Sequence, residues 1–210
     1  EERLRAARTN VLHALSHGAR QVVVVTSAGP REGASTTAAG LARVLALSGH
    51  RVVLVGGDLR SPSAVGAPGA PGLAEVLVGT ARLSQVLVEG EVPGLELLPA
   101  GDMPGNPSEL LGGRNMSDLL HHLAADRIVI IDAPPVCRFT DAVVLAEYAG
   151  GVLLVARAGR TSAEELREAA LAVGQGGGHM LGVVLTNVSD LGRGSRSAQT
   201  AVTHAESATV

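Results

Sequence analysis

One stretch decides the fold of this chain, and it reads Val22-Val23-Val24-Val25-Thr26-Ser27-Ala28-Gly29-Pro30-Arg31-Glu32-Gly33-Ala34-Ser35-Thr36-Thr37. Four consecutive valines are typical of a short buried strand. Gly29, Pro30 and Gly33 then interrupt the apolar run, and residues 35–47 are compatible with a helix. A strand, a glycine-containing loop and a helix form the context of a phosphate-binding loop. In such a loop, backbone N–H groups and the positive end of the helix dipole face the anion.

The loop departs from the phosphate-binding pattern G-x-x-x-x-G-K-[ST] in its charge. Ala28 takes the first glycine position, Gly33 the second, and Ser35 the position of a Mg²⁺ ligand. Ala34 takes the position of the lysine, which normally places a positive charge against the β- and γ-phosphates. The loop therefore has the shape of a nucleotide cradle without its main charge. A glycine-rich turn with no ligand is the alternative interpretation.

Composition limits the classes of protein that need to be considered. The 210 residues are 46% hydrophobic but only 1% aromatic, so one α/β domain with a core of Val, Leu, Ile and Ala is expected. A net charge of −3 gives no electrostatic reason to expect nucleic acid, and all 17 basic residues are arginine. Cys137 is the only cysteine, which excludes an internal disulfide, suits a reducing compartment and predicts a small packed side chain. The apolar runs are shorter than a membrane span, and no signal peptide is visible.

Strands and helices are predicted to alternate along the chain. Strands are expected at residues 22–26, 51–55, 95–99, 127–131, 151–156 and 180–186. Helices are expected at 1–17, 35–47, 72–78, 83–88, from a cap at Ser108, at 115–124 and 140–148, and after a cap at Thr161 or Ser162. This order predicts a parallel sheet covered on both faces. Residues 189–210 are rich in Ser, Ala, Thr and Gly, which predicts a disordered tail after a domain of residues 1–188.

Charged side chains follow two of the strands. Asp132 comes after strand 127–131, where a carboxylate next to the phosphate-binding loop holds Mg²⁺ directly or through water. Asp58 and Arg60 follow strand 51–55, at the carboxyl end where α/β proteins bind ligands. Asp132 is alternatively a turn former, and Asp58 and Arg60 are alternatively a plain surface ion pair.

The N-terminal helix carries a charged stripe. Glu2, Arg5 and Arg8 are spaced by three residues, which puts them on one helix face. Such a stripe is either an ordinary solvated surface with intrahelical ion pairs or an exposed surface for self-association.

Taken in order, these segments resemble the cytoplasmic domain of bacterial tyrosine kinases that control capsule and exopolysaccharide synthesis. Those kinases are related to the deviant P-loop ATPases that include the septum-site and partition proteins. The resemblance covers about residues 2–188 and implies a three-layer P-loop NTPase fold with a mostly parallel central sheet. Its motifs lie at residues 27–37 (Walker A), 52–62 (Walker A′) and 128–135 (Walker B), with further matching segments at 98–101, 106–111, 140–142 and 182–185.

The resemblance implies a site for ATP or ADP with Mg²⁺. The residues implied to contact the nucleotide are Gly29, Pro30, Arg31, Glu32, Gly33, Ala34, Ser35 and Thr36, with Asn187 or Thr186 beside the base. Those implied in catalysis are Asp58, Arg60 and Asp132, and those implied to hold the metal are Ser35, Asp58 and Asp132. The resemblance also implies a ring-shaped homo-oligomer that uses Glu2, Arg5 and Arg8, and a membrane activator of the chain-length-determinant type.

The sequence departs from this family at three functional positions. Ala34 replaces the loop lysine. Gly56 replaces the first Walker A′ aspartate, which in the family helps to hold Mg²⁺ and to activate the attacking hydroxyl. Residues 189–210 contain no tyrosine cluster for autophosphorylation, and the only tyrosine of the chain is Tyr148, within a predicted helix.

Three functions follow from this comparison, and the residues leave enzymatic activity open. The first is a degenerate kinase-like domain that binds nucleotide weakly and regulates polysaccharide synthesis and export. The second is an active tyrosine autokinase and ATPase of the same family. The third, a partition-type ATPase, fits less well because residues 27–29 lack the lysine that those proteins carry early in the loop. The expected location is the cytoplasmic face of the membrane, reached through a partner or a fused segment.

Overall fold

The computed structural model describes residues 2–16, 20–61, 65–67 and 69–188, so the tail predicted for 189–210 lies outside the described residues. The strands are β1 (Val22–Ser27), β2 (Val52–Gly56), β3 (Val88–Glu89), β4 (Leu95–Leu98), β5 (Ile128–Asp132), β6 (Gly151–Arg157) and β7 (Met180–Thr186). The helices are α1 (Glu2–Ser16), α2 (Ala34–Ala46), α3 (Leu73–Val78), α4 (Leu83–Val86), α5 (Pro107–Leu111), α6 (Arg114–Ala124), α7 (Asp141–Ala146) and α8 (Ala163–Gln175).

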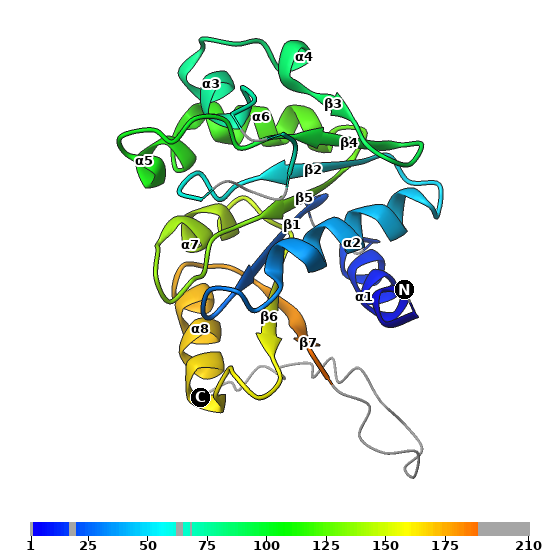
Figure 1. Cartoon of the computed structure of the whole chain (residues 1–210), viewed down its shortest axis with the longest axis vertical. Coiled ribbons are helices and arrows are strands. Elements are labelled where there is room, and N and C mark those ends of the chain that lie inside the picture. Colours follow the sequence, from blue (N-terminus) through cyan, green and yellow to red (C-terminus); the bar gives the residue numbers. More distant parts are fainter. Residues whose placement is uncertain (1, 17–19, 62–64, 68, 189–210) are drawn as a thin grey trace.

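The strands form one sheet in the order β3-β4-β2-β5-β1-β6-β7 (Figure 1). Every pairing is parallel except that of β3 with β4. Because β5 pairs in parallel with both β1 and β2, the carboxyl ends of these three strands lie at the same edge of the sheet. The predicted parallel sheet is confirmed, and this edge is where its ligand site is expected.

Two apolar clusters cover the two faces of the sheet and give the fold three layers. On β1, Val22 and Val24 belong to the cluster that contains buried residues of α6, α7 and α8. Val23 and Val25 belong to the other cluster, with residues of α1 and α2. All of β1 is buried because both of its faces are covered, which explains the unbroken valine run.

The structure corrects three local predictions. Residues 83–88 do not form one helix, since α4 ends at Val86 and the chain then extends into β3. Ser108 does not cap α5, which begins at Pro107 after Asn106, because proline fits the first helical position. Cys137 is exposed rather than packed.

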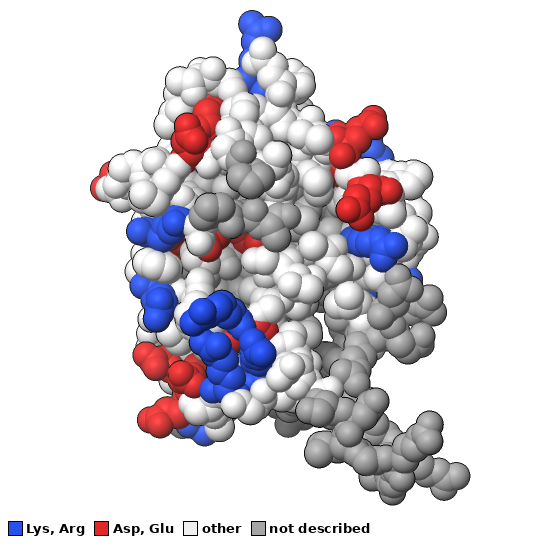
Figure 2. All heavy atoms as spheres, viewed as in Figure 1, with Lys and Arg blue, Asp and Glu red and all other residues white. Residues whose placement is uncertain are grey.

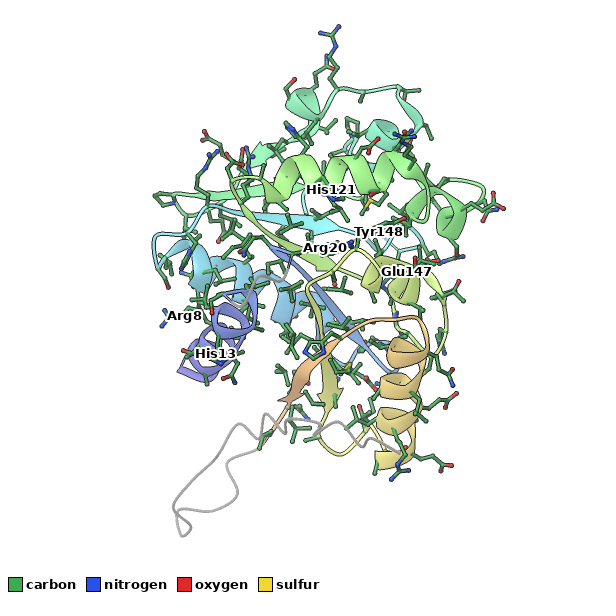
Figure 3. The ribbon with its side chains drawn as sticks, turned by 180° about the vertical axis from the view of Figure 1, so that it is seen from behind. Arg8, His13, Arg20, His121, Glu147 and Tyr148 are labelled. Carbon is green, nitrogen blue, oxygen red and sulfur yellow. The ribbon has the colours of Figure 1, made fainter. Side chains whose placement is uncertain are left out.

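The charged stripe of α1 is less exposed than predicted at its one described side chain (Figure 3 labels Arg8 on α1). Arg8 is half-buried, and its Nη1 donates a hydrogen bond of 2.6 Å to Ser48 Oγ, just beyond α2. Its Nε is buried and has no hydrogen-bond partner among the residues that the structure describes. Arg8 therefore contributes to the packing of α1 on α2 as well as carrying charge.

Candidate functional site

The phosphate-binding loop lies between β1 and α2 and leaves its backbone N–H groups available. Arg31 and Gly33 have left-handed φ angles of 61° and 101°, which is strained for a side-chain-bearing residue and ordinary for glycine. The first helical hydrogen bond runs from Thr37 N–H to the Gly33 carbonyl, at 2.9 Å. Within the described part of the chain, the backbone N–H groups of residues 31–36 donate no hydrogen bond to protein. Unpaired N–H groups at a helix N-terminus are the feature by which phosphate-binding loops hold an anion.

The outer side of this loop, in contrast, is held by hydrogen bonds. Glu32 is only 4% exposed, and its carboxylate accepts from Gly29 N–H at 3.1 Å and from Thr161 Oγ1 at 2.7 Å. Its carbonyl accepts from Thr186 Oγ1 at 2.6 Å. The loop is thereby tied both to the turn after β6 and to the end of β7.

Asp132 and Ser35 are the side chains next to the loop that could hold a metal ion through oxygen. Asp132 is the last residue of β5, is 1% exposed, and lies in register with Val25 of β1 on one side and Gly56 of β2 on the other. Ser35 lies in the first turn of α2. In the described ranges, no group of three or more His, Cys, Asp or Glu side chains forms a metal site by itself. One carboxylate and one hydroxyl fit a Mg²⁺ ion that takes its remaining ligands from phosphates and water.

Asp58 lies beyond β2 at the same sheet edge. It is half-buried, and one of its carboxylate oxygens accepts the N–H of Arg60 at 3.1 Å. Burial raises the pKa of Asp58 above its ordinary value, and backbone hydrogen bonds from Arg60 and Ser61 offset only part of that rise. A raised pKa makes this carboxylate a better proton acceptor than a surface aspartate. Asp58 and Arg60 also line a cavity of about 200 Å³, together with Gly101 and Met103.

The Arg60 guanidinium is fixed by a network that the sequence did not reveal. Its Nε and Nη2 donate to the two carboxylate oxygens of Asp141 at 2.7 and 3.1 Å. Nη2 also donates to Ser108 Oγ at 3.1 Å, and the guanidinium carbon lies 4.6 Å from the ring centre of Phe139. Arg60 therefore joins the Walker A′ segment to α5 and α7, and its catalytic role stays a prediction.

Gly56, which replaces the family's first Walker A′ aspartate, is closely covered. A Cβ atom at this position would lie 2.8 Å from the backbone nitrogen of Ala100. Real Cβ atoms do not approach backbone so closely, so the space of the missing side chain is filled by the segment after β4.

The end of β7 reaches the phosphate-binding loop from the other side. Thr186 Oγ1 donates to Glu32, and a Cβ at Gly33 would meet the Thr186 methyl at 3.3 Å. Asn187 follows with a left-handed φ of 54° and is exposed. The structure thus brings residues 29–36, Asn187, Asp132 and Asp58 to one edge of the sheet.

Arginines lie beside the loop, and Figure 2 shows basic side chains gathered on this part of the molecule. Arg157, the last residue of β6, donates from Nη1 to the Arg31 carbonyl at 3.2 Å. Arg31 itself is exposed. These cations add positive potential outside the loop.

Tyr148 lies at the opposite edge of the sheet. It shares a cavity of about 280 Å³ with Arg20, Val22 and His121, at the start of β1 (Figure 3). Its hydroxyl donates to the Gly112 carbonyl at 3.0 Å. The six residues of β1 separate this cavity from the phosphate-binding loop by about 20 Å. Tyr148 therefore lies at the end of the sheet opposite the phosphate-binding loop.

The functional side chains missed by sequence reasoning lie far from their partners along the chain. The sequence predicts Ser108 and Thr161 only as helix caps, and Asp141 only as part of a family segment. Ser162 caps α8, which leaves the Thr161 hydroxyl free to bond Glu32, 129 residues away. No local pattern in the sequence identifies that pairing.

Comparison with known proteins agrees with this geometry. No family model matches the sequence. The tyrosine-protein kinase YwqD of Bacillus subtilis is 36% identical over 188 residues, which are 88% of this chain and 79% of YwqD. The tyrosine-protein kinase Ptk of Acinetobacter johnsonii is 34% identical over 191 residues, but the chain spans only 26% of that longer protein.

The kinase domain of Escherichia coli tyrosine kinase ETK has the same fold. It superposes with a TM-score of 0.85 at 30% identity, over 93% of this chain and 78% of that domain. The three-layer P-loop fold and the resemblance seen in the sequence are confirmed. Since the similarity to YwqD extends over most of both proteins, the chain belongs to the bacterial tyrosine-protein kinase family.

Proposed function

We propose that this chain is a nucleotide-binding, kinase-like module that binds ATP or ADP weakly and transfers phosphate slowly or not at all. The observation that carries the proposal is the run of free N–H groups at residues 31–36. Backbone donors and a helix dipole bind phosphate without any side chain. Ala34 removes the lysine charge and leaves these donors in place.

Catalysis is expected to suffer more than binding. Losing one strong electrostatic contact to a transition state costs about 2.7–4 kcal/mol, or about 10²–10³ in rate. Gly56 removes a second group, and such losses combine without being additive. Asp58 and Asp132 remain as the carboxylates that would hold Mg²⁺ and accept a proton.

The family suggests the setting in which the module works. We propose that it regulates capsule or exopolysaccharide synthesis and export beside a membrane activator of the chain-length-determinant type, either separate or fused. Self-association through Glu2, Arg5 and Arg8 would assemble it at the cytoplasmic face of the membrane. Among the described helices, none has both the length and the apolar character needed to cross a bilayer.

Active tyrosine phosphorylation is the second candidate. The raised pKa of Asp58 favours it, because this carboxylate could accept the proton of an attacking hydroxyl in place of the missing aspartate. Phosphate transfer from Mg-ATP to a tyrosine-containing peptide separates this candidate from a binding module.

Calorimetric titration with Mg-ADP tests the proposal. We expect weak binding by the natural chain and binding at least tenfold tighter by Ala34→Lys, which corresponds to about 1.4 kcal/mol. The control Ala125→Lys adds the same charge on an exposed residue that follows α6, at the opposite end of the sheet, and should change nothing. An unchanged affinity in Ala34→Lys would mean that the loop is not a nucleotide site.

A further inference from the structure

We propose that Glu32 is a positioning residue of the nucleotide site, which holds the phosphate-binding loop in its ligand-binding shape by fastening it to the turn between β6 and α8. The inference rests on the proposed nucleotide binding and adds a role that the loop pattern does not assign, since that pattern leaves this position open.

The contacts of Glu32 form a continuous path out of the loop. One carboxylate oxygen accepts the N–H of Gly29, at the beginning of the loop, and the other accepts the hydroxyl of Thr161. The Thr161 hydroxyl in turn accepts the N–H of Arg157 at 2.8 Å. Arg157 returns to the loop through its bond to the Arg31 carbonyl. The loop and the end of β6 are therefore linked at two points, the Glu32 carboxylate and the Arg31 carbonyl.

These bonds use the groups that phosphate does not need. They occupy the Glu32 carboxylate and the carbonyl oxygens of Arg31 and Glu32, which would repel an anion. The N–H groups of residues 31–36 stay free on the described structure. Fixing the acceptors to the protein thus leaves the donors available for an anion.

Burial of a carboxylate has a cost that a packing role alone does not require. Glu32 is 4% exposed, and no arginine or histidine of the described residues forms an ion pair with it. A buried charge without a cation is unfavourable unless hydrogen bonds satisfy it, as Gly29 and Thr161 do here. Glu32 therefore holds the loop through the geometry of its hydrogen bonds more than through its charge.

The positioning role of Glu32 matters more for phosphate affinity because the loop lysine is missing. With Ala34 in the loop, phosphate affinity depends on how well the backbone donors are preorganised. Loosening the loop should therefore lower the affinity of the folded protein, in addition to any loss of global stability.

The test compares Glu32→Ala, Glu32→Gln and Thr161→Val by Mg-ADP titration and by amide hydrogen exchange without ligand. We expect Glu32→Ala to weaken binding at least fivefold and to speed exchange of the Gly29 amide at least tenfold. Glu32→Gln keeps the bond from Gly29 through its carbonyl and replaces the bond from Thr161 by one in the opposite direction, in which the Thr161 oxygen accepts from the amide as well as from Arg157 N–H, so it should bind within twofold of the natural chain. Thr161→Val tests the same link without altering the loop and should reproduce part of the loss.

Glu164→Ala is the matched control, since it removes an exposed carboxylate from the first turn of α8. Wild-type affinity and wild-type Gly29 exchange in both Glu32→Ala and Thr161→Val would overturn the inference. A lower melting temperature with unchanged affinity would also overturn it, because that is the result of a purely structural role. If the natural chain binds no nucleotide, the proposed function fails, while the exchange of Gly29 still decides whether Glu32 holds the loop.

Discussion

Replacing Arg60 by alanine should destabilise the protein much more than removing a surface arginine. The partner, Asp141, is fully buried, with a side-chain exposure of 0%, and receives two hydrogen bonds from Arg60 and one from Ser108. Without Arg60, the carboxylate would be left buried with the serine as its main side-chain donor. The change therefore tests whether this ion pair organises the Walker A′ segment.

The exposure of the ion pair determines how much folding stability Arg60→Ala should lose. Breaking a buried ion pair costs roughly 3–5 kcal/mol. The Arg60 side chain is 29% exposed, so water reaches the pair and the low end, about 3 kcal/mol, is expected. For a chain of this size, that loss lowers the melting temperature by about 6–12 °C.

The stability cost of Arg60→Ala should decrease as the pH falls. Burial would raise the pKa of Asp141, but hydrogen bonds from Arg60 and Ser108 outweigh it and hold the pKa below its ordinary value. A lowered pKa stabilises the folded state above the unfolded pKa of about 4, and this stabilisation is lost as the pH falls through the folded pKa. In Arg60→Ala the carboxylate keeps the burial that raises its pKa and loses the Arg60 donors that lower it, so it takes up a proton at higher pH. The cost of the substitution should therefore shrink as the pH falls from 7 to below 4.

Urea denaturation at several pH values measures the loss of stability in Arg60→Ala and how that loss changes with pH. The matched control is Arg114→Ala, which breaks an exposed pair with Asp118 at side-chain exposures of 92% and 68% and should cost under about 1 kcal/mol. Equal losses of stability in the two variants, or a loss in Arg60→Ala that does not vary with pH, would refute this account of Asp141.

Three other outcomes are expected. Gly56→Asp should lower stability by about 1–3 kcal/mol in urea denaturation, because its Cβ would press on the backbone of Ala100, and should leave phosphate transfer no faster. Mass spectrometry after incubation with Mg-ATP should find no phosphate on Tyr148, because the length of β1, about 20 Å, separates its cavity from the loop. Light scattering should show self-association that weakens with salt, since exposed ion pairs are screened. A variant with alanine at Glu2, Arg5 and Arg8 should lose that association, and unchanged assembly would make the stripe an ordinary solvated face.

The sequence predicted the parts of the site that depend on local pattern and on sheet topology. The valine run placed the loop at the end of β1, and a parallel sheet then brought Asp132 to its side. The bonds between Glu32 and Thr161, 129 residues apart, and between Arg60 and Asp141, 81 residues apart, depend on how three layers pack. A single Glu, Thr, Arg or Asp forms no repeating pattern in the sequence from which its partner could be predicted. Only the structure reveals these pairings.

The two substitutions at the site have unequal consequences for binding and for chemistry. Ala34 removes a charge from the loop but leaves its unpaired backbone N–H groups, so restoring lysine should restore affinity. Gly56 removes a carboxylate from a position where Ala100 has closed the space, so the missing side chain cannot simply be put back. We therefore expect affinity to be recoverable by one substitution, whereas rapid phosphate transfer would require the segment after β4 to move as well. Under the proposed function, a site with this pair of changes is suited to sensing a nucleotide more than to consuming it.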